Sequence, residues 1–172
     1  MRRVLLLVLL ASCGVEATKA LTPASSAKAD PALVGAWVPT GKDKEEFVIN
    51  VTAKGALVRV ELTGDKDPML FEGHVSVLAA DVKILNLRSL DPKGGGNVLF
   101  VRYAVNADGS LETWLVSDKH VKKALDAGTL KGTLGQYGGV TLDESPEKIT
   151  AFLLKEKRDE VFEKLATFKK KP

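Results

Sequence analysis

Apolar and polar residues alternate through much of residues 46–116, and this period of two favours strands over helices. One amphipathic hairpin is predicted from the runs at 47–51 and 56–62, which the turn Ala53-Lys54-Gly55 separates. Further runs follow at 71–77, 82–87, 98–105 and 111–116. Short consecutive runs joined by turns predict an antiparallel meander, because a tight turn can connect only antiparallel strands.

Two segments indicate where this meander reverses. Asp108-Gly109 separates two strong strand patterns and predicts a tight hairpin turn. The segment 91–97 contains three consecutive glycines, which suit neither helix nor strand and predict a hairpin loop. We do not interpret this loop as a phosphate-binding loop, because no Lys-Ser/Thr pair follows it and no helix is predicted to begin there.

The pattern changes to a helical one after Val116. Ser117 is a suitable N-cap for a helix over 118–127, and Gly128 is a suitable stop. A second helix is predicted to begin near Pro146. Its apolar residues at 149, 152 and 153 share one face, whereas Val161, Leu165 and Phe168 would lie about a third of a turn away. We therefore expect two helical pieces separated by a bend near 157–159.

The length and composition indicate one globular domain. The chain has 172 residues, of which 45% are hydrophobic and 27% charged. We predict this domain over residues 31–172, mainly β with C-terminal helices, its antiparallel meander forming a curved sheet or a small barrel. Residues 14–30 are rich in Ala, Ser, Thr and Lys and show no sustained apolar period, so we predict a flexible tether there.

The first twelve residues have the layout of a secretory signal. Arg2 and Arg3 precede a run of only Val and Leu at 4–10, and the small residues Ala11 and Ser12 follow. The apolar run is too short for a permanent transmembrane helix, which needs about 20 residues. Without its two arginines, the chain keeps 23 basic against 22 acidic residues, a net charge of +1. Overall charge therefore gives no argument for a nucleic-acid partner.

The segment Leu10-Ala11-Ser12-Cys13 resembles the lipobox of bacterial lipoproteins. The resemblance implies that the Cys13 thiol carries a diacyl lipid, that the chain is cut before Cys13, and that the new N-terminus is acylated by a palmitate-like chain. It also implies a lipid-anchored protein of the bacterial cell envelope. Gly14 stands where an Asp favours inner-membrane retention, so the outer membrane is expected.

An ordinary signal peptide is the alternative, cut after Ala17 or Ala20, with Cys13 in the discarded piece. Cys13 is the only cysteine, so the chain can form no intramolecular disulfide. An unpaired thiol in an oxidising compartment is explained by acylation. The lipobox is therefore the preferred interpretation.

Gly35-Ala36-Trp37, just before the first hairpin, resembles the Gly-x-Trp motif that opens lipocalins and lipocalin-like barrels. In that family the glycine permits a close turn, and the tryptophan plugs the closed end of the barrel. The resemblance implies a small lipocalin-like barrel with Trp37 at its base. The alternative is that Trp37 is an ordinary core residue on a strand.

Groups for catalysis are few. His74 is in phase with polar strand positions and is predicted to point outward, and His120 is predicted to be exposed in the first turn of a Lys-rich helix. Glu72 and His74 share a strand face, but two candidate ligands without a third do not make a metal site. We expect no catalytic residue, metal or cofactor. A hydrolase would require one histidine to meet a serine and a carboxylate in space.

Two functions remain. The preferred one is an interaction, assembly or structural module that docks on another envelope protein. The alternative is a lipocalin-like carrier or sensor of an apolar small molecule. The preference depends on the predicted inward residues, which are bulky enough to fill a small barrel: Phe47, Ile49, Val58, Val60, Phe71 and Phe100. The size of the internal cavity separates the two.

Overall fold

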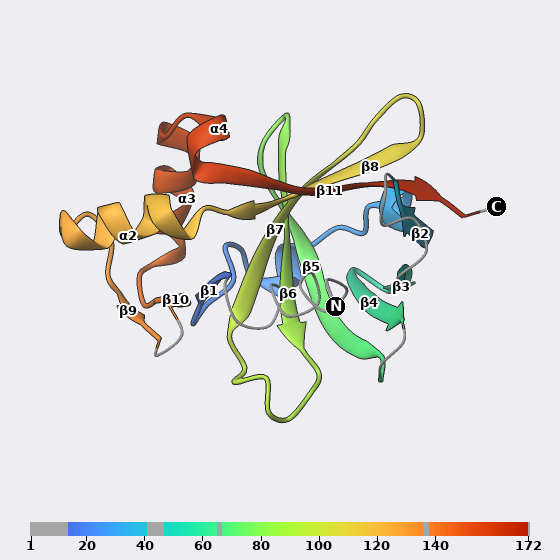
Figure 1. The fold of residues 1–172 in the computed structure, drawn as a ribbon, viewed down its shortest axis with the longest axis horizontal. Coiled ribbons are helices and arrows are strands. Elements are labelled where there is room, and N and C mark those ends of the chain that lie inside the picture. The colour runs from blue at the N-terminus through green and yellow to red at the C-terminus, as the bar shows by residue number, and fades with distance from the viewer. Residues whose placement is uncertain (1–13, 41–46, 65–66, 136–137, 172) are drawn as a thin grey trace, which may run out of the picture.

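A computed structural model describes residues 14–40, 47–64, 67–135 and 138–171. The protein is mainly β, with an eight-stranded, antiparallel, closed barrel and a few helices, as the sequence predicts (Figure 1). The barrel strands are β2 (Gly35–Pro39), β3 (Phe47–Lys54), β4 (Leu57–Gly64), β5 (Met69–Ala79), β6 (Val82–Ser89), β7 (Val98–Val105), β8 (Ser110–Val116) and β11 (Phe162–Lys170).

The meander β2 to β8 runs in chain order, and β11 closes the ring. β11 is antiparallel to both β8 and β2, so the last strand lies between the first and the seventh strands of the barrel. The predicted loop 91–97 joins β6 to β7, which pair along their length. The order and the closure are consistent with a small lipocalin-like barrel.

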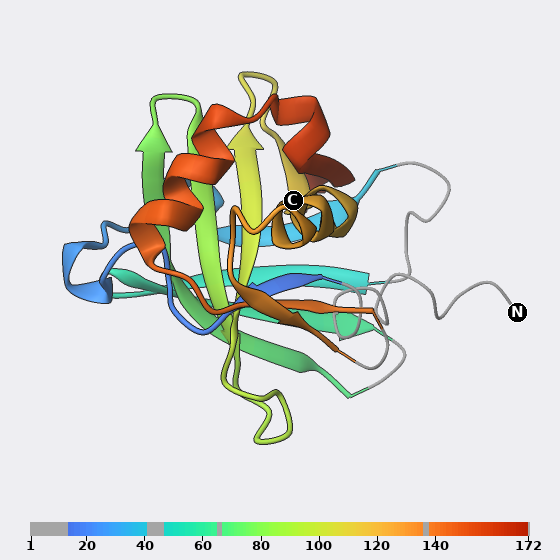
Figure 2. The same cartoon turned by 90° about the vertical axis from the view of Figure 1, so that its left-hand side faces the viewer.

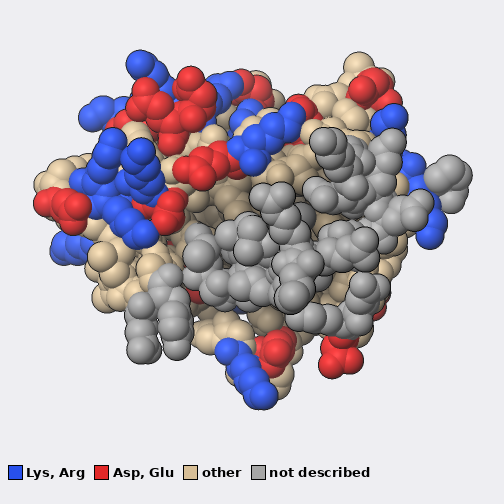
Figure 3. Space-filling model, in the orientation of Figure 1, with Lys and Arg blue, Asp and Glu red and all other residues tan. Residues whose placement is uncertain are grey.

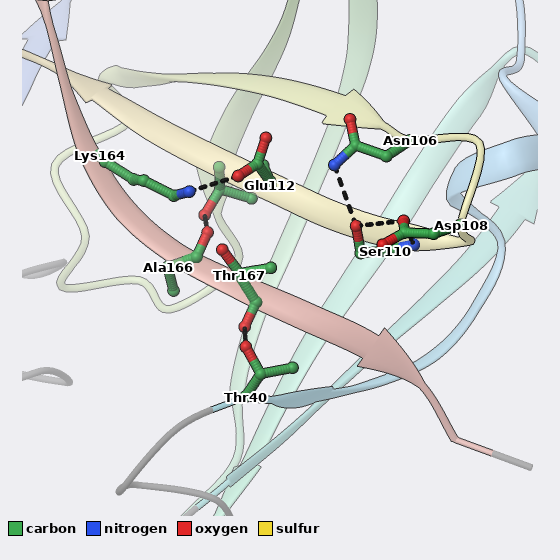
Figure 4. Close-up of polar contacts among 9 residues, drawn as sticks. Thr40, Asn106, Asp108, Ser110, Glu112, Lys164, Ala166 and Thr167 are labelled. Atoms are coloured by element: carbon green, nitrogen blue, oxygen red, sulfur yellow. Dashed lines mark hydrogen bonds and ion pairs between the residues drawn. The ribbon is translucent and has the colours of Figure 1, made fainter.

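The turn between β7 and β8 and the closing strand β11 are held by side chains of the turn, β8 and β11 (Figure 4). At the predicted Asp108-Gly109 turn, an Asp108 carboxylate oxygen accepts hydrogen bonds from the Ser110 amide at 2.9 Å and hydroxyl at 2.6 Å. Gly109 has a φ of +79°, which favours glycine. Lys164 of β11 forms an ion pair with Glu112 of β8. The predicted hairpin is therefore confirmed.

Residues 162–170 form β11, so the predicted second helical piece at the C-terminus is wrong. A helix does end near the predicted break, since α3 covers Pro146–Lys155 and the short α4 covers Arg158–Val161. In β11, the register shifts between Lys164 and Ala166. This irregularity interrupts the period of two. As a result, Leu165 and Phe168 both face the inside of the barrel although they are three residues apart, which is the spacing of residues on one face of a helix.

Residues 14–30 pack on the barrel, which corrects the predicted flexible tether. β1 (Val15–Ala17) is antiparallel to the start of β7 and parallel to β10 (Val140–Leu142), which pairs with β9 (Gly132–Leu134). Val15 and Ala17 are almost fully buried. The strand has only three residues, too few for its alternation to be recognised in the sequence.

Helices cover one outer face of the barrel. Figure 2 shows α2 (Asp118–Asp126), α3 and α4 in front of the strands, with β9 and β10 below them. The predicted cap is confirmed, because the Ser117 hydroxyl accepts a hydrogen bond from the His120 amide at 3.4 Å. Two short 3-10 helices, η1 (Ala24–Ser26) and η2 (Pro31–Leu33), lie between β1 and β2.

The protein has two hydrophobic cores, one inside the barrel and one between its outer face and the helices. The inner core contains five of the six predicted inward residues, four of them buried and Ile49 packed against them. Phe100 belongs instead to the outer core, with residues such as Val15, Ile84 and Ile149. Both faces of β7 are apolar and buried, so its sequence could not indicate which face was inward.

Candidate functional site

The interior of the barrel is nearly filled. An internal cavity of about 80 Å³ remains, lined by apolar side chains from several strands with Tyr103 and Thr113. Pockets that hold small ligands typically have volumes of about 300–1,000 Å³. Trp37 is 1% exposed, and its indole N–H donates a 2.8 Å hydrogen bond to the Leu33 carbonyl. Trp37 is thus a core residue on β2, the strand that follows η2, and its side chain helps to fill the interior of the barrel.

Asp30 connects η2 to the barrel through its two carboxylate oxygens. One accepts from the Ala32 amide at 3.1 Å, and the other accepts from Lys83 Nζ at 2.7 Å and the Tyr103 hydroxyl at 2.8 Å. Burial alone would raise the Asp30 pKa, but these hydrogen bonds outweigh it and hold the pKa below its ordinary value. Burial and the bond to Asp30 raise the Tyr103 pKa. The contact therefore joins a carboxylate to a neutral phenol.

A larger hollow of about 620 Å³ lies on the outer surface of the barrel. Residues 19–24 form one wall, and the outward side chains of β5 and β6 form the floor. The rest of the hollow is lined by Leu57, Leu90 and the first residues of α3. The principal polar side chains are Lys19, Glu72, His74, Arg88 and Glu147. We call this hollow the outer groove.

A buried polar network fixes the wall of the outer groove to its floor. The Asn86 side-chain oxygen accepts from the Leu21 amide at 2.9 Å, and its nitrogen donates to the His74 carbonyl at 3.1 Å and to the Ser76 hydroxyl at 2.8 Å. The Ser76 and Thr22 hydroxyls share a 2.6 Å hydrogen bond. Asn86 and Ser76 are at most 2% exposed. Residues 19–24 are therefore held by specific partners.

His74 points outward from the barrel, as predicted. It is nevertheless buried in this network, because residues 19–24 cover it. Its Nε2 donates to the Thr22 carbonyl at 2.8 Å, since a carbonyl oxygen can only accept. This bond fixes the neutral ring as the Nε2–H tautomer, with Nδ1 as an acceptor. The imidazole thus serves chiefly to hold the wall of the groove.

The other candidate groups, Glu72 and His120, have partners other than His74. Glu72 forms an ion pair with Lys54 at 2.9 Å. Within the described residues, no group of three or more His, Cys, Asp or Glu side chains is arranged to hold a metal. His120 is partly buried between α2 and α3, where its Nε2 lies 3.2 Å from a Glu156 carboxylate oxygen. The two histidines therefore belong to different sites.

Comparison with protein families, curated proteins and solved structures finds no match to this chain. The geometry of the outer groove and the barrel thus carries the functional argument.

Cys13 and the rest of the Leu10-Ala11-Ser12-Cys13 segment lie outside the described residues. No helix in the described part of the chain has the length and apolar character needed to cross a membrane.

Sequence reasoning missed Asn86, Ser76 and Thr22. Polar residues on a strand normally indicate a solvent-facing side. In addition, Asn86 and Ser76 are more than 50 residues away in the sequence from Leu21 and Thr22, with which they form hydrogen bonds.

Replacement of Asn86 by alanine is expected to lower the free energy of unfolding by about 1–3 kcal/mol, because the buried Leu21 amide and His74 carbonyl lose their partner. Chemical denaturation measures the loss, and hydrogen exchange at the Leu21 amide locates it. Asn50→Ala on β3 is the control, since Asn50 is half-buried and does not line the groove. Unchanged protection of the Leu21 amide would contradict the role assigned to Asn86.

Proposed function

We propose that this protein is a lipid-anchored module of the bacterial cell envelope, at the outer membrane where one exists, and that it binds a partner envelope protein through its outer surface. It acts as an interaction or structural module, without catalysis. The difference between the two cavities supports this proposal most directly. The interior offers about 80 Å³, whereas the outer groove offers about 620 Å³.

The position of β1 supports lipid attachment at Cys13. A signal cut after Ala17 or Ala20 would remove all of β1, including Val15 and Ala17, and would uncover the outer core. A cut before Cys13 leaves β1 whole. Loss of two such buried side chains and their backbone pairing would be expected to destabilise the barrel. The lipobox interpretation is thus the one that preserves the outer core.

The alternative, a carrier of an apolar molecule, has one observation in its favour. The inner cavity is bounded largely by aliphatic and aromatic side chains, such as Leu85, Leu99 and Phe168. Its volume nevertheless falls well below that of ordinary ligand pockets. A carrier would therefore require the barrel to open around its ligand.

The outer groove can be tested by photo-crosslinking in cells. A photo-reactive residue in place of Leu90, which lines the groove, is expected to give a discrete crosslinked band to one envelope protein. The same residue in place of Leu154 on α3 is the matched control, because the two leucines are 45% and 42% exposed. The bands are resolved by electrophoresis and identified by mass spectrometry. Identical crosslinking patterns from the two positions would contradict docking at the groove.

A further inference from the structure

The chain between the proposed lipid and the folded domain is very short. β1 begins at Val15, so Gly14 alone separates Cys13 from the first strand. Consecutive Cα atoms are about 3.8 Å apart, which places the Cys13 Cα within about 7 Å of the Val15 Cα. We infer that the barrel lies directly against the bilayer and that Leu134, the last residue of β9, faces the lipid. This inference rests on the proposed lipidation of Cys13.

The strand register identifies which surface must face the membrane. Val15 pairs with Val140 of β10, and Val140 pairs with Leu134 of β9. Neighbouring strands are about 4.8 Å apart, so Leu134 lies about 10 Å from Val15 across the sheet. β1 and β10 are parallel, and therefore the chain before β1 and the turn before β10 are at the same end of this sheet.

Leu134 has the exposed apolar side chain that a membrane contact requires. It is 59% exposed, and of the large apolar side chains in the described residues only Val77, at 63%, is more exposed. Hydrogen bonds from the Gly135 amide to the Gly139 carbonyl and from the Gly138 amide to the Gly135 carbonyl tighten the turn behind it. Leu134 thus lies at the end of a paired strand, close to the anchored residue.

One basic side chain, that of Lys122, lies beside this hairpin. The Lys122 ammonium would lie 3.9 Å from a Cβ placed on Gly138, so it is next to the turn. Figure 3 shows a group of Lys and Arg side chains over the region that α2 occupies in Figure 1. α2 carries Lys119, Lys122 and Lys123 against Asp118 and Asp126. Lys122 also forms an ion pair with Asp118 at 2.8 Å, so the helix carries an excess of one positive charge, and its attraction to the phosphate groups of anionic lipids is small.

The test labels a single new cysteine in the full chain. Acylation blocks the Cys13 thiol, so in Leu134→Cys the new thiol is the one that reacts with an environment-sensitive fluorophore. Val77→Cys is the matched control, because Val77 is 63% exposed and the β5–β6 hairpin lies well away from β9 and β10 in both views (Figures 1 and 2). The lipidated proteins are reconstituted in vesicles of phosphatidylcholine and phosphatidylglycerol, with and without spin-labelled lipid.

The label at 134 is expected to emit at shorter wavelength and to lose most of its emission to the spin-labelled lipid, and the label at 77 is expected to lose little. Mass spectrometry of the N-terminal peptide reports acylation independently. Equal quenching at both positions, or no quenching at 134 in acylated protein, would overturn the orientation and leave the anchor intact. An N-terminal peptide without acyl chains would overturn the proposed anchor itself, and the orientation with it.

Discussion

Replacement of Cys13 by alanine is expected to abolish incorporation of a labelled fatty acid and to block normal removal of residues 1–12. Alanine has no thiol, so no thioether to a diacylglycerol can form. The contribution of the lipid to membrane affinity is then lost, because each buried CH₂ contributes about 0.8 kcal/mol and two or three chains make a lasting anchor. The variant should accumulate as an unprocessed precursor without acyl chains.

The control for this experiment is Ser25→Ala in η1, an exposed position that leaves the outer core untouched. It should be labelled and processed like the unaltered chain. Metabolic labelling and electrophoretic mobility provide the two measurements. If Cys13→Ala still incorporates the fatty acid at the normal level, the anchor proposal is wrong.

Replacement of Trp37 by alanine is expected to lower the free energy of unfolding by about 3–5 kcal/mol. The indole is almost fully buried in the inner core, and the substitution also removes its hydrogen bond to the Leu33 carbonyl. Trp114→Ala is the control. Trp114 is half-buried on the outer face, where the Arg102 guanidinium lies 4.2 Å from its ring, so its loss should cost less. Urea denaturation at a fixed temperature measures both.

The same tryptophan tests whether the barrel is hollow in solution. Emission from Trp37, measured in a Trp114→Phe variant, should be blue-shifted and should not change when long-chain fatty acids or a fluorescent apolar probe are added. A packed interior gives no saturable binding. A carrier would instead be stabilised as ligand is added, by RT ln(1 + [L]/Kd). Stoichiometric binding that fatty acids compete for would make the carrier the better proposal.

The sequence predicted the hairpins well because each depends on local information. The alternation of 47–51 and 56–62 and the Asp108-Gly109 turn specify which residues pair without reference to the rest of the chain. β11 was missed because its irregularity breaks the period of two. β1 was missed because three residues are too few to show one.

The outer groove could not be predicted in the same way. His74 and Asn86 occupy outward strand positions, which ordinarily face water. They are buried because residues 19–24 cross above them, and the partners in this contact are more than 50 residues apart in the chain. The alternation of a strand indicates which face a side chain is on, but it does not indicate whether another segment covers that face.

The position of β11 also determines when the barrel can form. Its strand completes the ring between β8 and β2, so residues 162–170 must be present before either neighbouring edge is paired. β1 likewise waits for β7 and β10. Under the proposed export, the chain would therefore leave its translocation channel with two open sheet edges until residues 162–170 emerge. Since open edges invite pairing with other chains, such export would require either rapid closure or a chaperone.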